Sequence, residues 1–323
     1  MENTTKKLQL IFGDVNLGVK GDHFHYIFSY QKNGLESLFV NGREWLYREP
    51  KVAFWRATTD NDRGYQFSTD SAVWLGADLF PKCIDKTIKV NHEVIAFPDA
   101  PTNNQYSHLE MANTVEITYT FQTNTIPYTL VYVSYSVDET GDITISTTYK
   151  GKEGLPGLPA FGLRFIMPTP AKSFTYVGLS GETYPDRYKG GVLGEYTIEG
   201  LPVTPYLVPQ ECGMHMDTQS LRITRNTTLN PNDRQIDDFS LSFEKVDENF
   251  AFSCLPYTPF ELENALHQDE LPIARRTVLT IFGAVRGVGG IDSWSSGIEK
   301  AYEISAEEDH AFRFKINVNA ERL

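Results

Sequence analysis

The stretch Val115-Glu116-Ile117-Thr118-Tyr119-Thr120-Phe121 alternates apolar with polar side chains. Successive side chains of a β-strand point to opposite faces of a sheet, so this period of two places one apolar face on a core and one polar face outward. The same alternation recurs at residues 24–30, 143–149, 239–243 and 312–318. Aromatic residues, which favour strands, make up 13% of the chain. The pattern predicts strands along the whole sequence.

The segments between these strands favour an antiparallel arrangement. They are rich in Gly, Pro, Asn and Asp, and no regular alternation of strand with helix appears that would build a parallel sheet. Helices are expected to be few and short. Residues 258–261 have the form of a capping box with proline at the first helical position, and residues 71–80 are a second candidate. We therefore predict an all-β fold, a large antiparallel sandwich, formed as a single domain over residues 1–323.

Charge and composition argue against a nucleic-acid-binding protein and against a membrane-spanning one. The 29 Lys and Arg against 42 Asp and Glu give a net charge of −13, and no basic run exists that would bind a nucleic acid. No segment approaches the roughly 18 apolar residues of a membrane-spanning helix, and no apolar stretch follows the N-terminal residues as in a signal peptide. Cys83, Cys212 and Cys254 match no metal or redox spacing. We expect a cytoplasmic protein with reduced thiols and no metal of its own.

Four polar segments that contain glycine stand out from the strand pattern. In residues 54–64, carboxylate and amide side chains spaced by two could ligate a hard cation, but a turn cross-tied by its own Arg–Asp pairs is favoured. In residues 178–187, Glu182 and Asp186 could form an acid/base pair. The alternative there is a loop in which Arg187 neutralises a neighbouring carboxylate.

The other two segments also allow two interpretations each. In residues 205–215, Glu211 and His215 could act as a general acid–base couple, although such a histidine is more often simply hydrogen-bonded. Residues 287–295 begin with glycines but match neither a dinucleotide nor a phosphate loop. This segment offers Trp294, whose ring face suits the apolar face of a sugar; the alternative is a partly buried structural tryptophan.

Together and in this order, the segments resemble the small subunit of the two-subunit β-galactosidases of lactic-acid bacteria. The chain is likewise similar to the C-terminal domain of the single-chain β-galactosidases of glycoside hydrolase family two. The likeness covers residues 8–318 and is carried by Arg-Ala-Thr-Thr-Asp-Asn-Asp-Arg-Gly at 56–64, Tyr-Pro-Asp-Arg at 184–187, Pro-Tyr at 205–206 with Pro-Gln-Glu-x-Gly at 209–213, residues 262–271, and Gly-x-Gly-Gly-x-Asp-Ser-Trp at 287–294. The chain departs from the family pattern at Thr58, usually proline, and at residues 180–182, where Ser-Gly-Glu replaces Gly-Pro-x-Glu.

The resemblance implies a β-supersandwich similar to galactose mutarotase. It also implies that this chain completes the active site of a separate large subunit, which hydrolyses terminal β-D-galactosides such as lactose with retention of configuration. That partner would carry both catalytic glutamates and the Mg²⁺ and Na⁺ sites, so no catalytic residue is expected here. By match to the family, Trp294 would line the galactosyl pocket, supported in its loop by Asp292 and Ser293.

The resemblance further implies a segment at the mouth of the active site, with Asp60, Asn61, Asp62 and Gly64 at its start. Two other functions remain open from the sequence. One is a stand-alone aldose 1-epimerase, with Glu211 and either His215 or His267 as its acid and base. The other is a carbohydrate-binding module without catalytic context.

Overall fold

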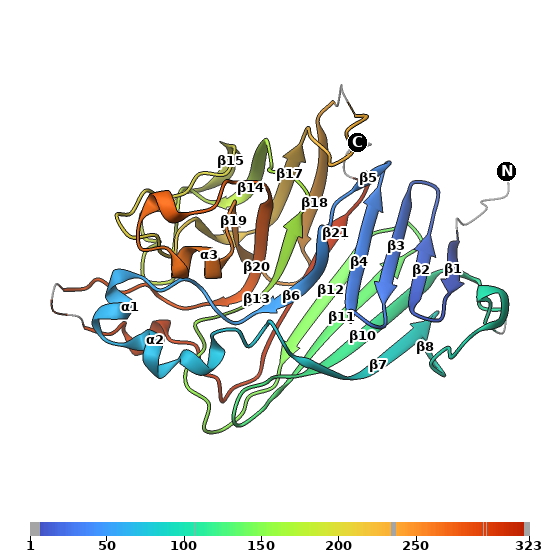
Figure 1. Ribbon diagram of the computed structural model, residues 1–323, viewed down its shortest axis with the longest axis horizontal. Coiled ribbons are helices and arrows are strands. Elements are labelled where there is room, and N and C mark those ends of the chain that lie inside the picture. Colours follow the sequence, from blue (N-terminus) through green and yellow to red (C-terminus); the bar gives the residue numbers. More distant parts are fainter. Residues whose placement is uncertain (1–6, 107, 234–236, 293, 295, 320–323) are drawn as a thin grey trace.

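The computed structural model describes residues 7–106, 108–233, 237–292, 294 and 296–319. Strands dominate this part of the chain, and all of their pairings are antiparallel. The prediction of an all-β antiparallel sandwich is confirmed (Figure 1). None of the helices among the described residues is long and apolar enough to cross a membrane.

The described residues form three sheets. The largest has ten strands in the order β15 (Leu193–Glu199), β14 (Ser173–Leu179), β17 (Ser220–Arg225), β18 (Phe239–Lys245), β21 (His310–Asn317), β12 (Ile143–Tyr149), β11 (Leu130–Asp138), β10 (Thr114–Gln122), β7 (Lys82–Val90) and β8 (Glu93–Ile95). A six-stranded sheet follows the order β5 (Arg43–Glu44), β4 (Gly34–Val40), β3 (Phe24–Ser29), β2 (Asn16–Lys20), β1 (Leu8–Phe12) and β9 (Met111–Ala112). A five-stranded sheet follows the order β16 (Met214–Thr218), β19 (Phe250–Leu255), β20 (Thr277–Val285), β13 (Ala160–Met167) and β6 (Arg48–Ala53).

The two smaller sheets pack on different parts of the ten-stranded sheet. In the six-stranded sheet, Phe28 contacts Tyr135 of β11 with ring centroids 5.6 Å apart. In the five-stranded sheet, Phe165 contacts Phe243 of β18 at 5.8 Å, edge to face. Aromatic pairs in this geometry add to the stabilisation from burial itself. The core therefore lies between the large sheet and the two smaller ones, as the alternating pattern requires.

Period two holds along several strands of the large sheet, among them β11, β12 and β14, but not along the central strands of the five-stranded sheet. β11 alternates between buried and half-buried side chains along its whole length. Every residue of β13 and of β19 is buried. These strands lie inside the five-stranded sheet and are covered on both faces, so no polar face is required of them. A continuous apolar run is the sequence pattern that corresponds to this burial.

Helices are short, as predicted, and the three labelled α-helices lie at the left-hand end of the molecule in Figure 1. The described residues form α1 (Asp60–Gly64), α2 (Phe67–Asp70) and α3 (Pro259–Asn264), with 3-10 turns at Ala72–Trp74, Thr102–Asn104, Gln268–Glu270 and Lys300–Tyr302. The capping box at Thr258 is confirmed, because Thr258 and Glu261 each bond to the other's backbone.

A second helix over residues 71–80 is wrong. Only the 3-10 turn Ala72–Trp74 forms there. The backbone becomes extended at Leu75, with ψ of 112°, and Gly76 adopts a φ of +78° that ends helical geometry. The buried Trp74 indole donates to the carbonyl oxygen of Pro156 at 2.8 Å, and this bond fixes the turn against the loop between β12 and β13.

Candidate functional site

The four polar segments singled out by the sequence meet at the end of the sandwich that carries α1. Hydrogen bonds join α1 to the glycine loop at residues 287–290, to the Asp186–Arg187 turn through that loop, and to Gln210. Residues 54–60 leave β6 and enter α1 through Thr59, whose hydroxyl accepts from the Asp62 amide at 3.1 Å. A capping box of this kind satisfies amides that a helix start would leave unpaired.

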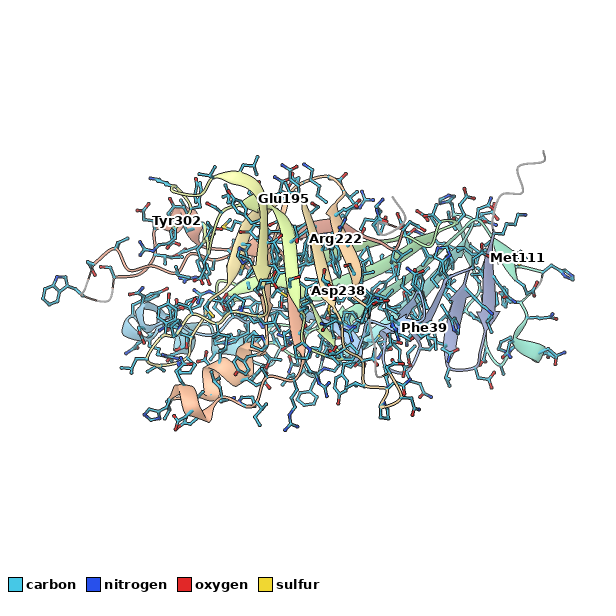
Figure 2. The ribbon with its side chains drawn as sticks, turned by 90° about the horizontal axis from the view of Figure 1, so that it is seen from above. Phe39, Met111, Glu195, Arg222, Asp238 and Tyr302 are labelled. Carbon is cyan, nitrogen blue, oxygen red and sulfur yellow. The ribbon has the colours of Figure 1, made fainter. Side chains whose placement is uncertain are left out.

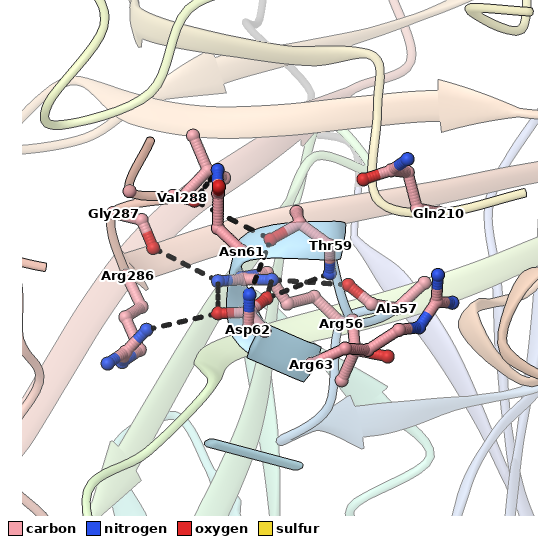
Figure 3. A network of polar contacts seen from close by, with 12 residues as sticks. Arg56, Ala57, Thr59, Asn61, Asp62, Arg63, Gln210, Arg286, Gly287 and Val288 are labelled. Atoms are coloured by element: carbon pink, nitrogen blue, oxygen red, sulfur yellow. Dashed lines mark hydrogen bonds and ion pairs between the residues drawn. The ribbon is translucent and has the colours of Figure 1, made fainter. Parts of the chain in front are cut away.

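Asp62 is the centre of this network (Figure 3). Its carboxylate is fully buried and accepts from both terminal nitrogens of Arg56, at 2.5 and 3.2 Å. Three further groups donate to the same carboxylate: Arg286 at 3.4 Å, the Thr59 amide at 2.9 Å and the Tyr65 hydroxyl at 3.2 Å. The bidentate pair with Arg56 gives the contact a fixed direction. The interpretation of residues 54–64 as a turn cross-tied by an Arg–Asp pair is confirmed.

The electrostatics of Asp62 follow from these contacts. Burial acts to raise the pKa of its carboxyl, but the charge of Arg56, the hydrogen bonds from Arg56 and Thr59, and the charge of Arg286 outweigh burial and lower the pKa. The carboxylate is therefore ionised in the folded protein at neutral pH. Asp62 is thus buried beneath the start of α1, whereas Asp60 in the same helix is exposed.

The glycine loop is held directly against α1. The Asn61 side-chain amide donates to the carbonyl oxygen of Val288 at 3.2 Å, and Arg56 donates to that of Gly287 at 3.0 Å. A Cβ atom at Gly290, where φ is +81°, would lie 2.7 Å from an Arg187 nitrogen and 2.9 Å from the Asn61 amide nitrogen. Glycine is required there for both backbone geometry and space.

The Tyr184–Arg187 segment forms hydrogen bonds with the other side of the glycine loop. The Asp186 carboxylate accepts from the amides of Val288 and Gly289 at 3.1 and 2.7 Å, and Arg187 donates to the carbonyl oxygen of Gly289. Glu182 instead accepts from Thr204 and from the amide of Gly213. The two carboxylates proposed as an acid/base pair thus each hold a different loop, and Arg187 binds a carbonyl oxygen.

Glu211 lies buried behind the network. Burial raises its pKa to about 8, opposed by the charge of Arg56 and aided by the charges of Glu182 and Asp62. Its carboxyl group is therefore protonated at neutral pH and cannot act as a base there. Burial, and then the charge of Glu211, also raises the pKa of the nearby Tyr184 phenol.

His215 is a core residue. Its ring stacks on Phe252 at 4.9 Å and contacts Tyr176 at 4.6 Å, and burial lowers its pKa to about 4. His215 as the acid and Glu211 as the base, the roles assigned from the sequence, would each require the opposite protonation state at neutral pH. His267, the other candidate acid, lies on the surface and bonds to Glu270 at 2.9 Å.

Trp294 projects into solvent with 87% of its surface exposed. The interpretation of Trp294 as a partly buried structural residue is therefore wrong. Asp292 supports the turn that presents it: its carboxylate accepts from the Trp294 amide at 2.8 Å and from the Ser296 hydroxyl at 2.5 Å. Ser293, the third predicted member of this segment, lies outside the described residues.

The sequence did not single out several residues that build the site. Arg286 donates to Asp62 and its guanidinium lies 3.7 Å from the centre of the Phe67 ring. Gln210, present in a motif but assigned no role, exchanges hydrogen bonds with Asp60. Glu263 of α3 accepts from both the amide and the hydroxyl of Thr58 at 2.6 and 2.7 Å. Among the described residues, no group of three or more His, Cys, Asp or Glu is arranged to hold a metal ion.

Comparisons of the sequence with known proteins identify one family. The model of the β-galactosidase small chain matches residues 20–316. The β-galactosidase small subunit of Latilactobacillus sakei is 57% identical over 98% of this chain and 100% of that protein. The β-galactosidases of Streptococcus thermophilus and Halalkalibacterium halodurans are 31% and 33% identical over 96% and 98% of this chain, which spans only 27% and 29% of their length. A galactose mutarotase-like protein from Lactobacillus casei aligns over 94% of this chain and 99% of its own, with a TM-score of 0.43 and 11% identity.

Replacing Asp62 with asparagine removes the negative charge shared by two buried arginines. We expect the Asp62→Asn variant to lose about 3–5 kcal/mol of unfolding free energy at pH 7, measured by urea denaturation, because an unpaired buried charge remains. The control is Asp60→Asn, an exposed carboxylate paired with Arg63, for which we expect a loss below about 1 kcal/mol.

The difference in unfolding free energy between wild type and Asp62→Asn should shrink as the pH falls. The folded pKa of Asp62 is lowered, so the stability from its ionised form is complete above the unfolded pKa of about 4 and is lost as pH falls through the folded pKa. Wild type and Asp62→Asn should therefore converge in strong acid. Equal stability of the two proteins at pH 7 would contradict this account of the network.

The contribution of Glu211 to the unfolding free energy should fall as the pH rises, which is the opposite of the dependence expected for Asp62. Its folded pKa of about 8 lies above the unfolded value, so its contribution is complete below about pH 4.5 and is lost as pH rises through 8. We expect Glu211→Gln, which mimics the neutral acid, to gain unfolding free energy relative to wild type between pH 5 and 8, by up to about 5 kcal/mol. Glu195→Gln, on exposed β15, is the control and should follow the wild-type pH profile. A constant difference between wild type and Glu211→Gln over this range would refute the buried neutral acid.

Proposed function

The chain belongs to the β-galactosidase small-chain family, and we propose that it completes the active site of a separate large chain that hydrolyses terminal β-D-galactosides such as lactose. The observation that carries the proposal is the match over the whole length of the Latilactobacillus sakei small subunit. The longer relatives are three to four times the length of the matched region. The part of those proteins that this chain does not match would be supplied here by the large chain.

The proposal assigns both catalytic carboxylates to the large chain. A retaining glycosidase uses two carboxyl groups about 5–5.5 Å apart, one of them ionised as the nucleophile. At the loop end of this chain, Asp62 is bound by two arginines and Asp186 by two backbone amides, while Glu211 is buried and protonated. These groups stabilise loops. The Mg²⁺ and Na⁺ sites belong to the large chain in the same proposal.

Trp294 is the residue of this chain proposed to touch substrate. Its exposed indole offers a flat apolar face that can stack on a sugar ring. The Asp292 turn fixes the backbone beneath it. In this role Trp294 positions the galactosyl group and excludes water, and it transfers no proton.

A cytoplasmic setting is part of the proposal. Cys83, Cys212 and Cys254 are free thiols, and Cys212 and Cys254 are buried. Burial raises the pKa of Cys212 to about 12, so this thiol stays protonated and unreactive. Three unpaired cysteines suit a reducing compartment.

The decisive test is hydrolysis of a chromogenic β-galactoside. We expect the purified chain alone to be inactive, and activity to appear when it is mixed with the large chain from the same source. The large chain alone should retain at most a small fraction of that activity, because its site lacks one wall. Hydrolysis by this chain alone would place a working carboxylate pair within it and overturn the proposal.

Substituting Trp294 tests the role of the exposed ring. In the mixed enzyme, Trp294→Ala should weaken transition-state binding by about 1–3 kcal/mol, read as a fall in kcat/KM of roughly 5- to 150-fold. Trp294→Phe, which keeps an aromatic face, should recover part of this loss. Glu182→Gln is the control and should keep kcat within about tenfold of wild type, since that carboxylate holds a loop. Unchanged kinetic constants in Trp294→Ala would remove this residue from the site.

A further inference from the structure

Three arginines, Arg48, Arg275 and Arg276, line a hollow of about 370 Å³ at one end of the five-stranded sheet. The hollow lies where β6 and β20 begin and β13 ends. The Asp62 network lies beyond the opposite ends of β6 and β20, so the hollow takes no part in it. A volume of this size is in the range of small-molecule sites.

The floor of the hollow is apolar. Arg48 of β6 pairs with Ile166 of β13, and Ile166 pairs with Val278 of β20, so these residues form one row across three strands. The side chains of directly paired residues project from the same face of a sheet. The row thus places Arg48 beside two buried aliphatic side chains, which form a surface that a ligand can cover.

Arg276 is held in place before any ligand binds. Its guanidinium donates to the carbonyl oxygen of Pro168 at 3.1 Å and lies 3.3 Å from the centre of the Tyr47 ring. The Tyr47 amide donates to the carbonyl oxygen of Ile166 at 2.7 Å, which fixes the backbone beneath that ring. A side chain that is already ordered loses little further freedom on binding, so less of the binding free energy is offset.

The lining of the hollow is positively charged, although the chain as a whole carries −13. Glu261 supplies one carboxylate against the three guanidiniums. Among the described residues, none of these guanidiniums forms an ion pair with a carboxylate. Guanidinium groups bind phosphate through paired N–H donors. The group that fits between them is therefore a phosphate.

Glu261 and Tyr47 suit a part of the ligand that carries hydroxyl groups. One carboxylate oxygen of Glu261 accepts from the amide and the hydroxyl of Thr258, at 2.7 and 2.9 Å, which leaves the other oxygen to accept from a ligand hydroxyl. Tyr47 is half exposed, and an aromatic ring offers contact area to the apolar side of a sugar. Hydroxyl acceptor, ring and arginines together match a phosphorylated sugar.

We propose that this hollow binds a hexose phosphate. Arg48, Arg275 and Arg276 hold the phosphate group, and the sugar lies over the floor formed by Ile166 and Val278. The site is separate from the galactoside site of the proposed function and does not depend on it. The recess and its apolar floor favour a small molecule over an acidic protein segment, which needs no such floor.

The test measures binding of glucose 6-phosphate to the full chain by isothermal titration calorimetry at pH 7 and low salt. We expect a dissociation constant below about 1 mM and no binding of glucose at the same concentrations. Inorganic phosphate should bind at least about fivefold more weakly, because it does not reach the apolar floor. Raising the salt concentration should weaken the binding of both anions.

Substitution of two exposed arginines locates the site. Arg48→Gln combined with Arg275→Gln should raise the dissociation constant at least about 30-fold, since two charge-assisted hydrogen-bonding groups are lost. Arg222→Gln is the control and should stay within about twofold of wild type. Arg222 is an exposed arginine of β17, and Figure 2 shows it well apart from α3, the pale orange helix at the lower left. All three positions are exposed, so thermal unfolding of the variants should match that of wild type.

The outcomes that would overturn the proposal are distinct. Wild type that binds no glucose 6-phosphate up to about 10 mM would do so, as would a double variant that binds it like wild type or a control that weakens equally. Inorganic phosphate that binds as tightly as the ester would refute the hexose. A double variant that instead loses association with the large chain, while wild type binds no ester, would assign the arginines to an acidic protein surface. Hydrolysis by the mixed chains is a separate measurement, so none of these outcomes bears on the proposed function.

Discussion

The arrangement of the loop end depends on one buried ion pair, between Arg56 and Asp62. Removing two charges from water is costly, and such a pair persists only where further hydrogen bonds complete it. Here the Asp62 carboxylate accepts further hydrogen bonds from the Thr59 amide, the Tyr65 hydroxyl and Arg286. The Arg56 guanidinium donates further hydrogen bonds to the carbonyl oxygens of Ala57 and Gly287. These bonds reach two backbone segments, residues 57–65 and residues 286–287. One carboxylate therefore fixes the start of α1 relative to the glycine loop, and removing it would release both.

The sandwich supplies the rigid frame that this ion pair needs. β6 delivers residues 54–59 to the network, and β20 delivers Arg286 and the glycine loop. Both strands pair with β13, whose residues are all buried. Closely packed protein interiors deform little, so the two loops leave the sheet at a fixed separation. The positive φ angles of Gly289 and Gly290 then turn the second loop back over α1.

The sequence predicted strands where one face is buried and the other is not, as in β10 and β12, because only then does burial impose a period of two. It could not predict the fully buried β19, since a short apolar run fits a helix equally well. In the site, the close spacing of Arg56 and Asp62 indicated a cross-tied turn. Arg286 escaped notice because its partner lies 224 residues away in the chain. Nothing in the sequence marks a pairing that only the sheet topology creates.

The protonation states at this end argue for a supporting chain. Catalysis of acid–base type needs groups whose pKa lies near the working pH and whose atoms are accessible. Glu211 and His215 are both buried, and burial raises the pKa of Glu211 to about 8 and lowers that of His215 to about 4. Asp62 and Asp186 are occupied by structural hydrogen bonds. The Trp294 indole, by contrast, is both aromatic and exposed. Such groups contribute contact area and exclude water, which is the contribution that a wall of another chain's active site requires.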